Sequence, residues 1–250
     1  DGKSDEVKQL ASELNVQYVR RTHNKNAKSG NVNNGLIASK AEFFAIIDAD
    51  FIPKRDFIIH MLGFMVHKDV GFVQSPQSFS NTDKFIARGT SAAQEIFYDY
   101  VQPAKNSSNS AFCVGTNVLF RRKAVDEIGG IFELDHSEDI WTSLMLHEHH
   151  WKSIYTTRVL AIGQAPDTIM SYLKQQKRWA QGGFTIFFSR NPLLSRKLNY
   201  DQKTQYMYSA LFYFVGISIL IYLILPLLFL FFGVSAIKLT GYSRIISLMD

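Results

Sequence analysis

The feature that most constrains this chain is an apolar run close to its end. Between Thr204 and Ile237 no residue is charged, and the heart of this run is longer than the ~20 apolar residues that a helix needs to cross a bilayer. A central helix of a soluble protein is the alternative, but a surface that is aromatic and aliphatic on all sides is typical of a membrane span. The sequence therefore predicts one transmembrane helix, with any excess between Tyr206 and Phe214 in the membrane interface, where tyrosines are common.

Basic residues on the two sides of the run indicate its orientation. Four of them precede it: Arg190, Arg196, Lys197 and Lys203. Only Lys238 and Arg244 closely follow it. Because positive charge collects on the cytosolic side of a membrane, the part before the run is expected in the cytosol. The predicted organisation is a cytosolic catalytic domain over 1–200, an interfacial segment plus the membrane helix over 201–237, and a tail over 238–250.

Composition sets further limits. The chain has 250 residues, 46% hydrophobic content, a net charge of +5 and a pI near 9.2, which suits nucleic acid, a phosphorylated small molecule or an acidic membrane face as partner. Its aromatic residues lie in apolar runs and not in a basic groove, so no nucleic-acid partner is expected. The single cysteine, Cys113, excludes an internal disulfide framework. The start DGKSDEVKQL has neither an initiator methionine nor a signal-peptide core, so we expect a piece of a longer protein.

The segments before the apolar run alternate between helical and strand-like patterns. Expected helices cover 5–14, the later part of 28–41, and 57–68, 85–100, 137–150 and 170–188. Expected strands cover 15–20, 43–48, 71–75, 152–157 and 159–163, and 112–125 is expected to be a strand that turns into a helix. Strand, helix, strand at this spacing predicts an α/β fold with a mainly parallel central sheet.

Two carboxylates follow the apolar strand at 43–48, in the sequence FFAIIDADFIP. Ligands of open α/β sheets bind beyond the carboxyl ends of the strands. Asp48 and Asp50, at positions i and i+2, can both reach one hard cation that keeps sites free for phosphate oxygens. Short acidic pairs also cap helices and mark turns. The pattern by itself leaves a metal site and a plain turn both open.

Four short segments occur in this order: DG at 1–2, DAD at 48–50, SED at 137–139 and QQKRW at 175–179. They resemble the D, DxD, TED and QxxRW motifs of processive family 2 glycosyltransferases, the group that holds cellulose, chitin and hyaluronan synthases. KSGNVNN is similar to the KAGNINN of bacterial cellulose synthase catalytic subunits, and QSPQSFSNTD and FCVGTNVLFRR resemble their PQxF and FFCGS segments. The resemblance covers nearly all of the chain and implies a GT-A catalytic fold joined to membrane helices.

The chain departs from the family pattern at three places. The family's first motif is usually DDG, so Asp1 would be its second aspartate. Ser137 replaces the usual Thr of the third motif and keeps a hydroxyl for a helix N-cap. Cys113 is followed by Val114 before Gly115, so this acceptor-side loop differs from the strict cellulose synthase form.

On the acceptor side, the resemblance implies that Asp139 is the general base. Such a base takes the proton of the acceptor hydroxyl while the diphosphate leaves, and its place in the first turn of a helix predicts a lowered pKa. Trp179, Cys113 and Glu138 are expected at the acceptor, with the indole of Trp179 stacked on a sugar ring. Simple capping of a helix by residues 137–139 is the alternative.

On the donor side, the resemblance implies a UDP-sugar held with Mg²⁺ or Mn²⁺. Asp48 and Asp50 are expected to hold the metal. Contacts to the nucleotide and its diphosphate are expected from Asp1, Lys28, Gly30, Asp48, Gln175 and Arg178. Arg suits a diphosphate because its guanidinium offers paired donors. The alternatives are a solvated loop lysine at Lys28 and an interfacial anchor at Trp179.

Two further groups invite a functional interpretation. The HEHH sequence at 147–150 lacks the spacing of a zinc-binding helix, so we do not predict a zinc site there. Arg121 and Arg122 fit either contacts to an anionic or sugar ligand or a solvated helix start.

The expected function is that of an inverting glycosyltransferase of the inner (plasma) membrane that extends a β-linked polysaccharide. The cellulose synthase-like segments favour a β-1,4-glucan made from UDP-glucose. Expected partners are the UDP-sugar, the growing polysaccharide, membrane lipid and a polysaccharide export partner. The alternatives are a synthase of another β-linked polymer from UDP-N-acetylglucosamine or a related donor, and a catalytically inactive membrane-anchored module that binds sugar nucleotides.

Overall fold

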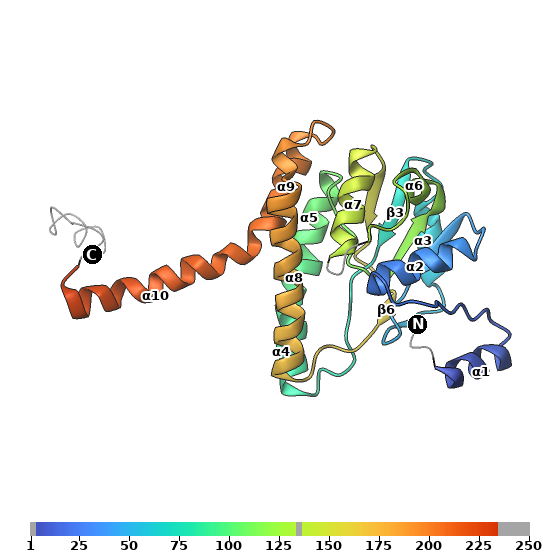
Figure 1. Cartoon of the computed structure of the whole chain (residues 1–250), viewed down its shortest axis with the longest axis horizontal. Coiled ribbons are helices and arrows are strands. Elements are labelled where there is room, and N and C mark those ends of the chain that lie inside the picture. The colour runs from blue at the N-terminus through green and yellow to red at the C-terminus, as the bar shows by residue number, and fades with distance from the viewer. Residues whose placement is uncertain (1–3, 134–136, 235–250) are drawn as a thin grey trace. The chain divides into compact units, whose positions relative to one another are not determined.

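The computed structural model describes residues 4–133 and 137–234 (Figure 1). The chain divides into two compact units, Asp1–Ala210 and Leu211–Asp250. The first unit thus extends beyond the domain boundary predicted at residue 200, and it carries all of the strands in the described part of the chain.

A four-stranded mixed sheet forms the centre of the first unit. Its strand order is β1-β4-β3-β5, with the bounds Phe43–Ile46, Val118–Arg121, Val70–Gln74 and Lys152–Tyr155. Strand β4 is antiparallel to both β1 and β3, and β3 is parallel to β5. Strands β1, β3 and β5 therefore run in one direction, as expected for a mainly parallel sheet, and β4 is reversed. A small second sheet pairs β2 (Ile52–Pro53) with β6 (Ala161–Ile162).

Helices cover both faces of the sheet. Alternate residues of each strand point to opposite faces, and both sets include apolar side chains in the central strands. Phe72 and Phe120 belong to a core shared with α2 (Ala27–Ile37), α6 (Arg122–Glu127) and α7 (Glu138–Glu148). Their neighbours Val73 and Leu119 belong to a second core that includes Phe57 and Met61 of α3 (Phe57–Phe64). The central strands are buried on both faces, and their sequences are accordingly apolar throughout.

The expected strand at 15–20 is wrong. This segment follows α1 (Asp5–Glu13) in an extended course, and among the described residues no strand pairs with it. It is held to the start of α1 instead: Arg20 forms an ion pair with Asp5, and the hydroxyl of Tyr18 donates to the carbonyl of Ser4.

A π-helical turn interrupts the helix expected at 85–100. Helix α4 (Phe85–Ile96) continues through the π-helix Phe97–Val101 into α5 (Gln102–Ser107) without a break in the chain direction. The π turn buries Tyr98, whose carbonyl accepts a hydrogen bond of 2.8 Å from the hydroxyl of Tyr155. It thereby anchors this long helical segment on β5.

Helix α9 (Tyr200–Leu211) belongs, up to Ala210, to the first unit. Tyr206 is 1% exposed, and its hydroxyl hydrogen-bonds to Nδ1 of His147 at 2.7 Å. The other ring nitrogen of His147 bonds to the hydroxyl of Ser153 at 2.9 Å. The side chain of Tyr206 is therefore buried within the first unit, where its hydroxyl completes a polar contact with α7, and the interfacial position of the segment 206–214 stays a prediction.

The second unit holds the apolar helix. After a 3₁₀ turn at Phe212–Phe214, α10 runs over Val215–Phe232, and Gly233 ends it in the left-handed conformation with φ 65°. Within the described residues one helical segment, Tyr200–Phe232, is long and apolar enough to cross a membrane, and no part of its apolar window is buried. This agrees with the single span that the sequence predicts.

We expect Tyr206→Phe to lower the free energy of unfolding by about 1–3 kcal/mol, because it leaves a buried ring nitrogen of His147 without a partner. Burial lowers the pKa of His147 to about 3, so protonation of the ring does not compensate at neutral pH. Urea unfolding of the detergent-solubilised protein, followed by tryptophan fluorescence, measures the change. Tyr208→Phe is the matched control, since Tyr208 lies on the same helix and is exposed. Equal losses in the two variants would contradict the role of the Tyr206 hydroxyl.

Candidate active site

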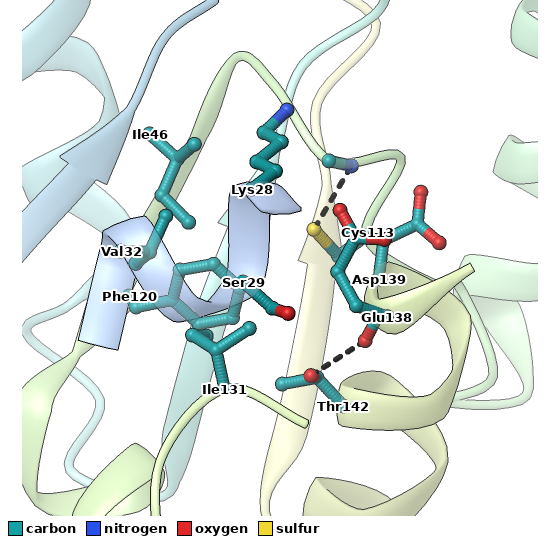
Figure 2. Close-up of a pocket in the computed structure, with 11 residues that line it drawn as sticks. Lys28, Ser29, Val32, Ile46, Cys113, Phe120, Ile131, Glu138, Asp139 and Thr142 are labelled. Carbon is teal, nitrogen blue, oxygen red and sulfur yellow. Dashed lines mark hydrogen bonds between the residues drawn. The ribbon is translucent and has the colours of Figure 1, made fainter. Parts of the chain in front are cut away.

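A narrow pocket lies between the first turns of α2, the loop that enters β4 and the first turn of α7 (Figure 2). Figure 2 shows apolar side chains, among them Ile46, Val32 and Phe120, on one side of the pocket and polar groups of α7 on the other. The pocket brings together these residues singled out in the sequence: Lys28, Cys113, Glu138 and Asp139.

Asp48 is attached to this pocket through Lys28, with which its carboxylate forms an ion pair. The backbone N–H of Asp48 donates to Oγ1 of Thr116 at 2.9 Å, and its carbonyl accepts from the N–H of Phe51, which closes a turn. The side chains of Lys28 and Asp48 are 35% and 38% exposed. A ligand can therefore reach this pair from solvent.

Asp50 lies exposed in the same turn. In the described part of the chain, no side chain forms a hydrogen bond or ion pair with its carboxylate. The described residues also contain no group of three or more His, Cys, Asp or Glu side chains that could hold a metal ion. The donor set at Asp48 and Asp50 nevertheless fits Mg²⁺ or a similar cation, since such an ion is commonly held by one or two carboxylates and completed by substrate phosphates and water.

Gly115 allows Lys28 and Asp139 to approach each other. Its φ is +85°, and a Cβ at this position would lie 3.3 Å from Oδ2 of Asp139 and 3.4 Å from Nζ of Lys28. A side chain here would enter the space between the two charged groups. Glycine is thus favoured at residue 115 by both its backbone conformation and its surroundings.

Burial, with a smaller contribution from the charge of Glu138, raises the pKa of Asp139 to about 7. The lowered pKa predicted from the helix N-terminus is therefore wrong. The N–H of Ile140, which donates to Oδ1 at 2.8 Å, and the charge of Lys28 both favour the carboxylate, but desolvation outweighs them. A carboxylate that titrates near neutral pH is well suited to accept a proton.

Ser137 occupies the N-cap position of α7, as expected, but its hydroxyl makes no capping bond. Its φ is 62°, and its Oγ lies against α8 (Ile169–Ser189), where a Cβ on Gly182 would be only 1.6 Å away. The absent side chain of Gly182 thus brings α8 into close contact with the end of α7 that carries Asp139.

The three side chains of the QxxRW segment precede Gly182 on α8 at helical spacings that place them on the same face. Arg178 is exposed, and Gln175 and Trp179 are partly buried. Oε1 of Gln175 is buried, and it has no hydrogen-bond partner among the described residues. Gly182 follows them at the same helical spacing, and it is the position at which this face of α8 meets Ser137. None of the three side chains lines the pocket.

Several other residues singled out in the sequence make contacts that support the fold. A Cβ on Gly30 would lie 2.3 Å from the carbonyl oxygen of Lys25, so Gly30 permits a tight turn at the start of α2 and does not line the pocket. Cys113 is buried, which raises the pKa of its thiol. The guanidinium of Arg121 donates to the carbonyls of Met65, His67 and Val70, and that of Arg122 to the carbonyls of Leu36 and Ser39. Asp1 lies outside the described residues.

The sequence analysis missed two hydroxyl groups of the site. Thr116 accepts the N–H of Asp48, and Ser143 contacts both Asp139 and Cys113. Ser143 lies one helical turn after Asp139, so the spacing of four residues could have indicated that the two side chains share a face of the helix. Nothing in the local sequence marks Thr116, because its partner is distant along the chain.

The chain is similar to known glycosyltransferases. Residues 43–243 match the family model described as glycosyl transferase family group 2. The chain is 32% identical to the UDP-forming cellulose synthase catalytic subunit of Pseudomonas fluorescens, over 97% of this chain and 34% of that protein. It is 33% identical to the corresponding subunit of Xanthomonas axonopodis pv. citri, over 87% of this chain and 31% of that protein. The chain thus spans about a third of the length of these relatives.

Solved structures share the fold. The mannosyltransferase PcManGT from Pyrobaculum calidifontis, in complex with GDP-Man and Mn²⁺, has a TM-score of 0.66 at 17% identity, covering 84% of this chain and 57% of that chain. S. aureus TarS 1–349, in complex with UDP-GlcNAc, has a TM-score of 0.53 at 13% identity, covering 84% of this chain and 59% of that chain. The GT-A fold expected from the sequence is therefore confirmed.

We expect Gly115→Ala to destabilise the protein more than Gly129→Ala. Both glycines have a positive φ, of +85° and +84°, but no atom lies within 4 Å of a Cβ at Gly129. Gly129→Ala should therefore report the backbone strain alone, about 1–2 kcal/mol, whereas Gly115→Ala also displaces Lys28 or Asp139. Thermal unfolding of the two variants measures the difference. Equal shifts in Tm would show that the charged groups accommodate the methyl group freely.

Proposed function

This chain belongs to the glycosyl transferase family group 2, and we propose that it is the catalytic part of a membrane-bound inverting enzyme that extends a β-1,4-glucan from UDP-glucose. The observation that carries the proposal is that Lys28, Asp48 and Asp139, distant in sequence, meet at one pocket beyond the end of β1. The donor and product are supported by the UDP-forming cellulose synthase subunits to which the chain is similar.

The donor diphosphate is proposed to bind beside the turn that carries Asp48 and Asp50. Their carboxylates would hold Mg²⁺ or Mn²⁺, which when bound neutralises charge on the leaving diphosphate. Lys28 would contact a phosphate oxygen, which is supported by its position in the lining of the pocket and by its ion pair with Asp48. Gln175 and Arg178 would contact the diphosphate from α8. Asp1 and the backbone near Gly30 are proposed to contact the nucleotide.

Asp139 is proposed to act on the acceptor. Its carboxylate takes the proton of the acceptor hydroxyl, the hydroxyl oxygen forms a bond to C1 of the donor sugar, and the bond from C1 to the diphosphate breaks with release of UDP. Attack from the face opposite the diphosphate inverts the configuration at C1. The apolar walls of the pocket, such as Val32 and Phe120, exclude water and hold the pKa of Asp139 near the working pH.

The acceptor sugar is proposed to lie between α7 and α8. Trp179 would stack on its ring, since an indole face suits the apolar face of a sugar. Glu138 and Cys113 would contact it at the pocket wall. The close packing of Gly182 on Ser137 supports this arrangement, because it holds the two helices together at this point.

The catalytic domain, proposed to cover residues 1–200, is assigned to the cytosolic face of the inner (plasma) membrane. The segment 201–237 would anchor it in membrane lipid, which the apolar helix α10 supports, and 238–250 would follow as a tail. The basic residues before this segment would lie against the anionic inner leaflet. A growing polysaccharide at this surface requires a route across the membrane, so we also propose an export partner.

Asp139→Asn should lower kcat by ~10²-fold or more while the affinity for UDP stays close to that of the wild type, because a general base acts on the acceptor proton. Asp139 must be ionised to accept a proton, so wild-type activity should rise as the pH increases through about 7. The residual activity of the variant should lack this rise. Steady-state kinetics on both sides of pH 7, with UDP titration by calorimetry, measures both effects. Asp69→Asn, a surface change beside Lys152, is the control. Loss of UDP binding in Asp139→Asn would instead make Asp139 a nucleotide ligand.

Membranes that contain the full-length protein should convert radiolabelled UDP-glucose into long material that a β-1,4-glucanase degrades. Chelation of divalent cations should stop incorporation, and Mg²⁺ or Mn²⁺ should restore it. Incorporation only from UDP-N-acetylglucosamine would overturn the donor, and products with one or two added sugars would overturn chain extension.

Asp50→Asn should abolish metal-dependent UDP binding, because it removes the exposed carboxylate of the turn. Full activity without divalent cations would overturn the metal site.

A further inference from the structure

One buried hydroxyl group joins the two chain segments that form the polar wall of the pocket. Ser143 lies on α7 and is fully buried. Its hydroxyl donates to the carbonyl of Asp139 at 2.9 Å and accepts the backbone N–H of Cys113 at 2.8 Å. A single side chain thus connects the main chain of the proposed base to the loop that enters β4.

This loop reaches the pocket at Gly115. The N–H of Gly115 donates to Sγ of Cys113 at 3.3 Å, and its Cα faces the Asp139 carboxylate. On its other side the loop is fixed to the end of β3, since Gln74 accepts the N–H of Val114 and donates to the carbonyl of Thr116. Among the hydrogen bonds of the described residues, the bond from Cys113 to Ser143 is the connection between this loop and α7.

We propose that Ser143 is a positioning residue for the transfer reaction: its hydroxyl holds the Cys113–Gly115 loop against Asp139 and thereby fixes the approach of the acceptor to the base. This role rests on the proposed function of the pocket. Without the hydroxyl the N–H of Cys113 would be buried and unpaired, a state that favours opening of the loop. An open loop would admit water to Asp139 and widen the gap that the acceptor hydroxyl must cross.

A serine inside a helix commonly bonds to the carbonyl four residues before it, which by itself has no functional meaning. Ser209 on α9 supplies the matched control, because its hydroxyl also donates to the carbonyl four residues before it, that of Gln205, at 3.2 Å. It has no bond to the Cys113 loop. A comparison of the two serines therefore separates the loss of a helix back-bond from the loss of the contact with the loop.

The first measurement follows the rate at which a maleimide labels Cys113 in the full-length protein, read by mass spectrometry at that residue. Ser143→Ala should accelerate labelling about tenfold, which corresponds to the loss of one hydrogen bond. Ser209→Ala should leave the rate unchanged, and Ser143→Thr, which keeps a hydroxyl, should label more slowly than Ser143→Ala. The proposal would be overturned if Cys113 in Ser143→Ala were labelled at the wild-type rate. It would also be overturned if Ser209→Ala accelerated the labelling of Cys113 as much as Ser143→Ala does.

The second measurement uses the transfer reaction. Ser143→Ala should lower kcat about tenfold with an unchanged KM for UDP-glucose, and the rise of activity with pH should shift to lower pH as water reaches Asp139. Calorimetric UDP binding checks that each variant is folded, and Ser143→Cys replaces Ser143→Ala in the transfer assay if the latter fails this check, because a thiol is a weaker hydrogen-bond acceptor than a hydroxyl. A raised KM with unchanged kcat would overturn the positioning role. Absence of transfer by the wild type would refute the proposed function, whereas the labelling rates would still decide whether Ser143 holds the loop.

Discussion

The close approach of Lys28 and Asp139 across Gly115 is the constraint on which the arrangement of the pocket depends. These residues lie at the starts of α2 and α7, with a loop between them that has no side chain at the point of contact. Lys28 also forms an ion pair with Asp48, so its ammonium group connects the turn after β1 to the pocket that contains Asp139. Desolvation disfavours the charged form of Asp139, and the nearby positive charge of Lys28 offsets part of this effect.

Helix α7 transmits this arrangement to the rest of the first unit. Its first turn carries Asp139, its middle bonds to the loop before β4 through Ser143, and its last turn bonds to α9 through His147 and Tyr206. Asp139, Ser143 and His147 are spaced four residues apart and therefore share one face of the helix. Three polar residues of this face of α7 thus serve three different parts of the unit: the pocket, the loop before β4 and α9.

Much of the fold could be predicted because the strands are short apolar runs bounded by polar residues, as at Phe43–Ile46 and Val70–Gln74. Local pattern failed where the outcome depends on a distant partner. Residues 15–20 have strand-like composition, but among the described residues no strand lies beside them. The buried contact of Tyr206 with His147 likewise has no local sequence signal, because its partner is 59 residues away. The raised pKa of Asp139 follows from desolvation by walls drawn from α2, β4 and α7, which no local motif records.

The π turn at Phe97–Val101 is the point at which this long helical segment can change in length by one residue. It accommodates one more residue than an α-helical turn, and the segment after it is placed accordingly: Gln102 bonds to the main chain of Phe112, and the buried ammonium of Lys105 bonds to the carbonyl of Gln205. Because the π turn takes up this extra residue locally, removal of one residue within Phe97–Val101 would restore a regular α-helix and leave α5 facing the same way. Removal of one residue from α4 would instead rotate α5 by about 100° relative to the first turns of α4, and both side chains would then face away from their partners. Related sequences should therefore differ in length at the π turn and not within α4.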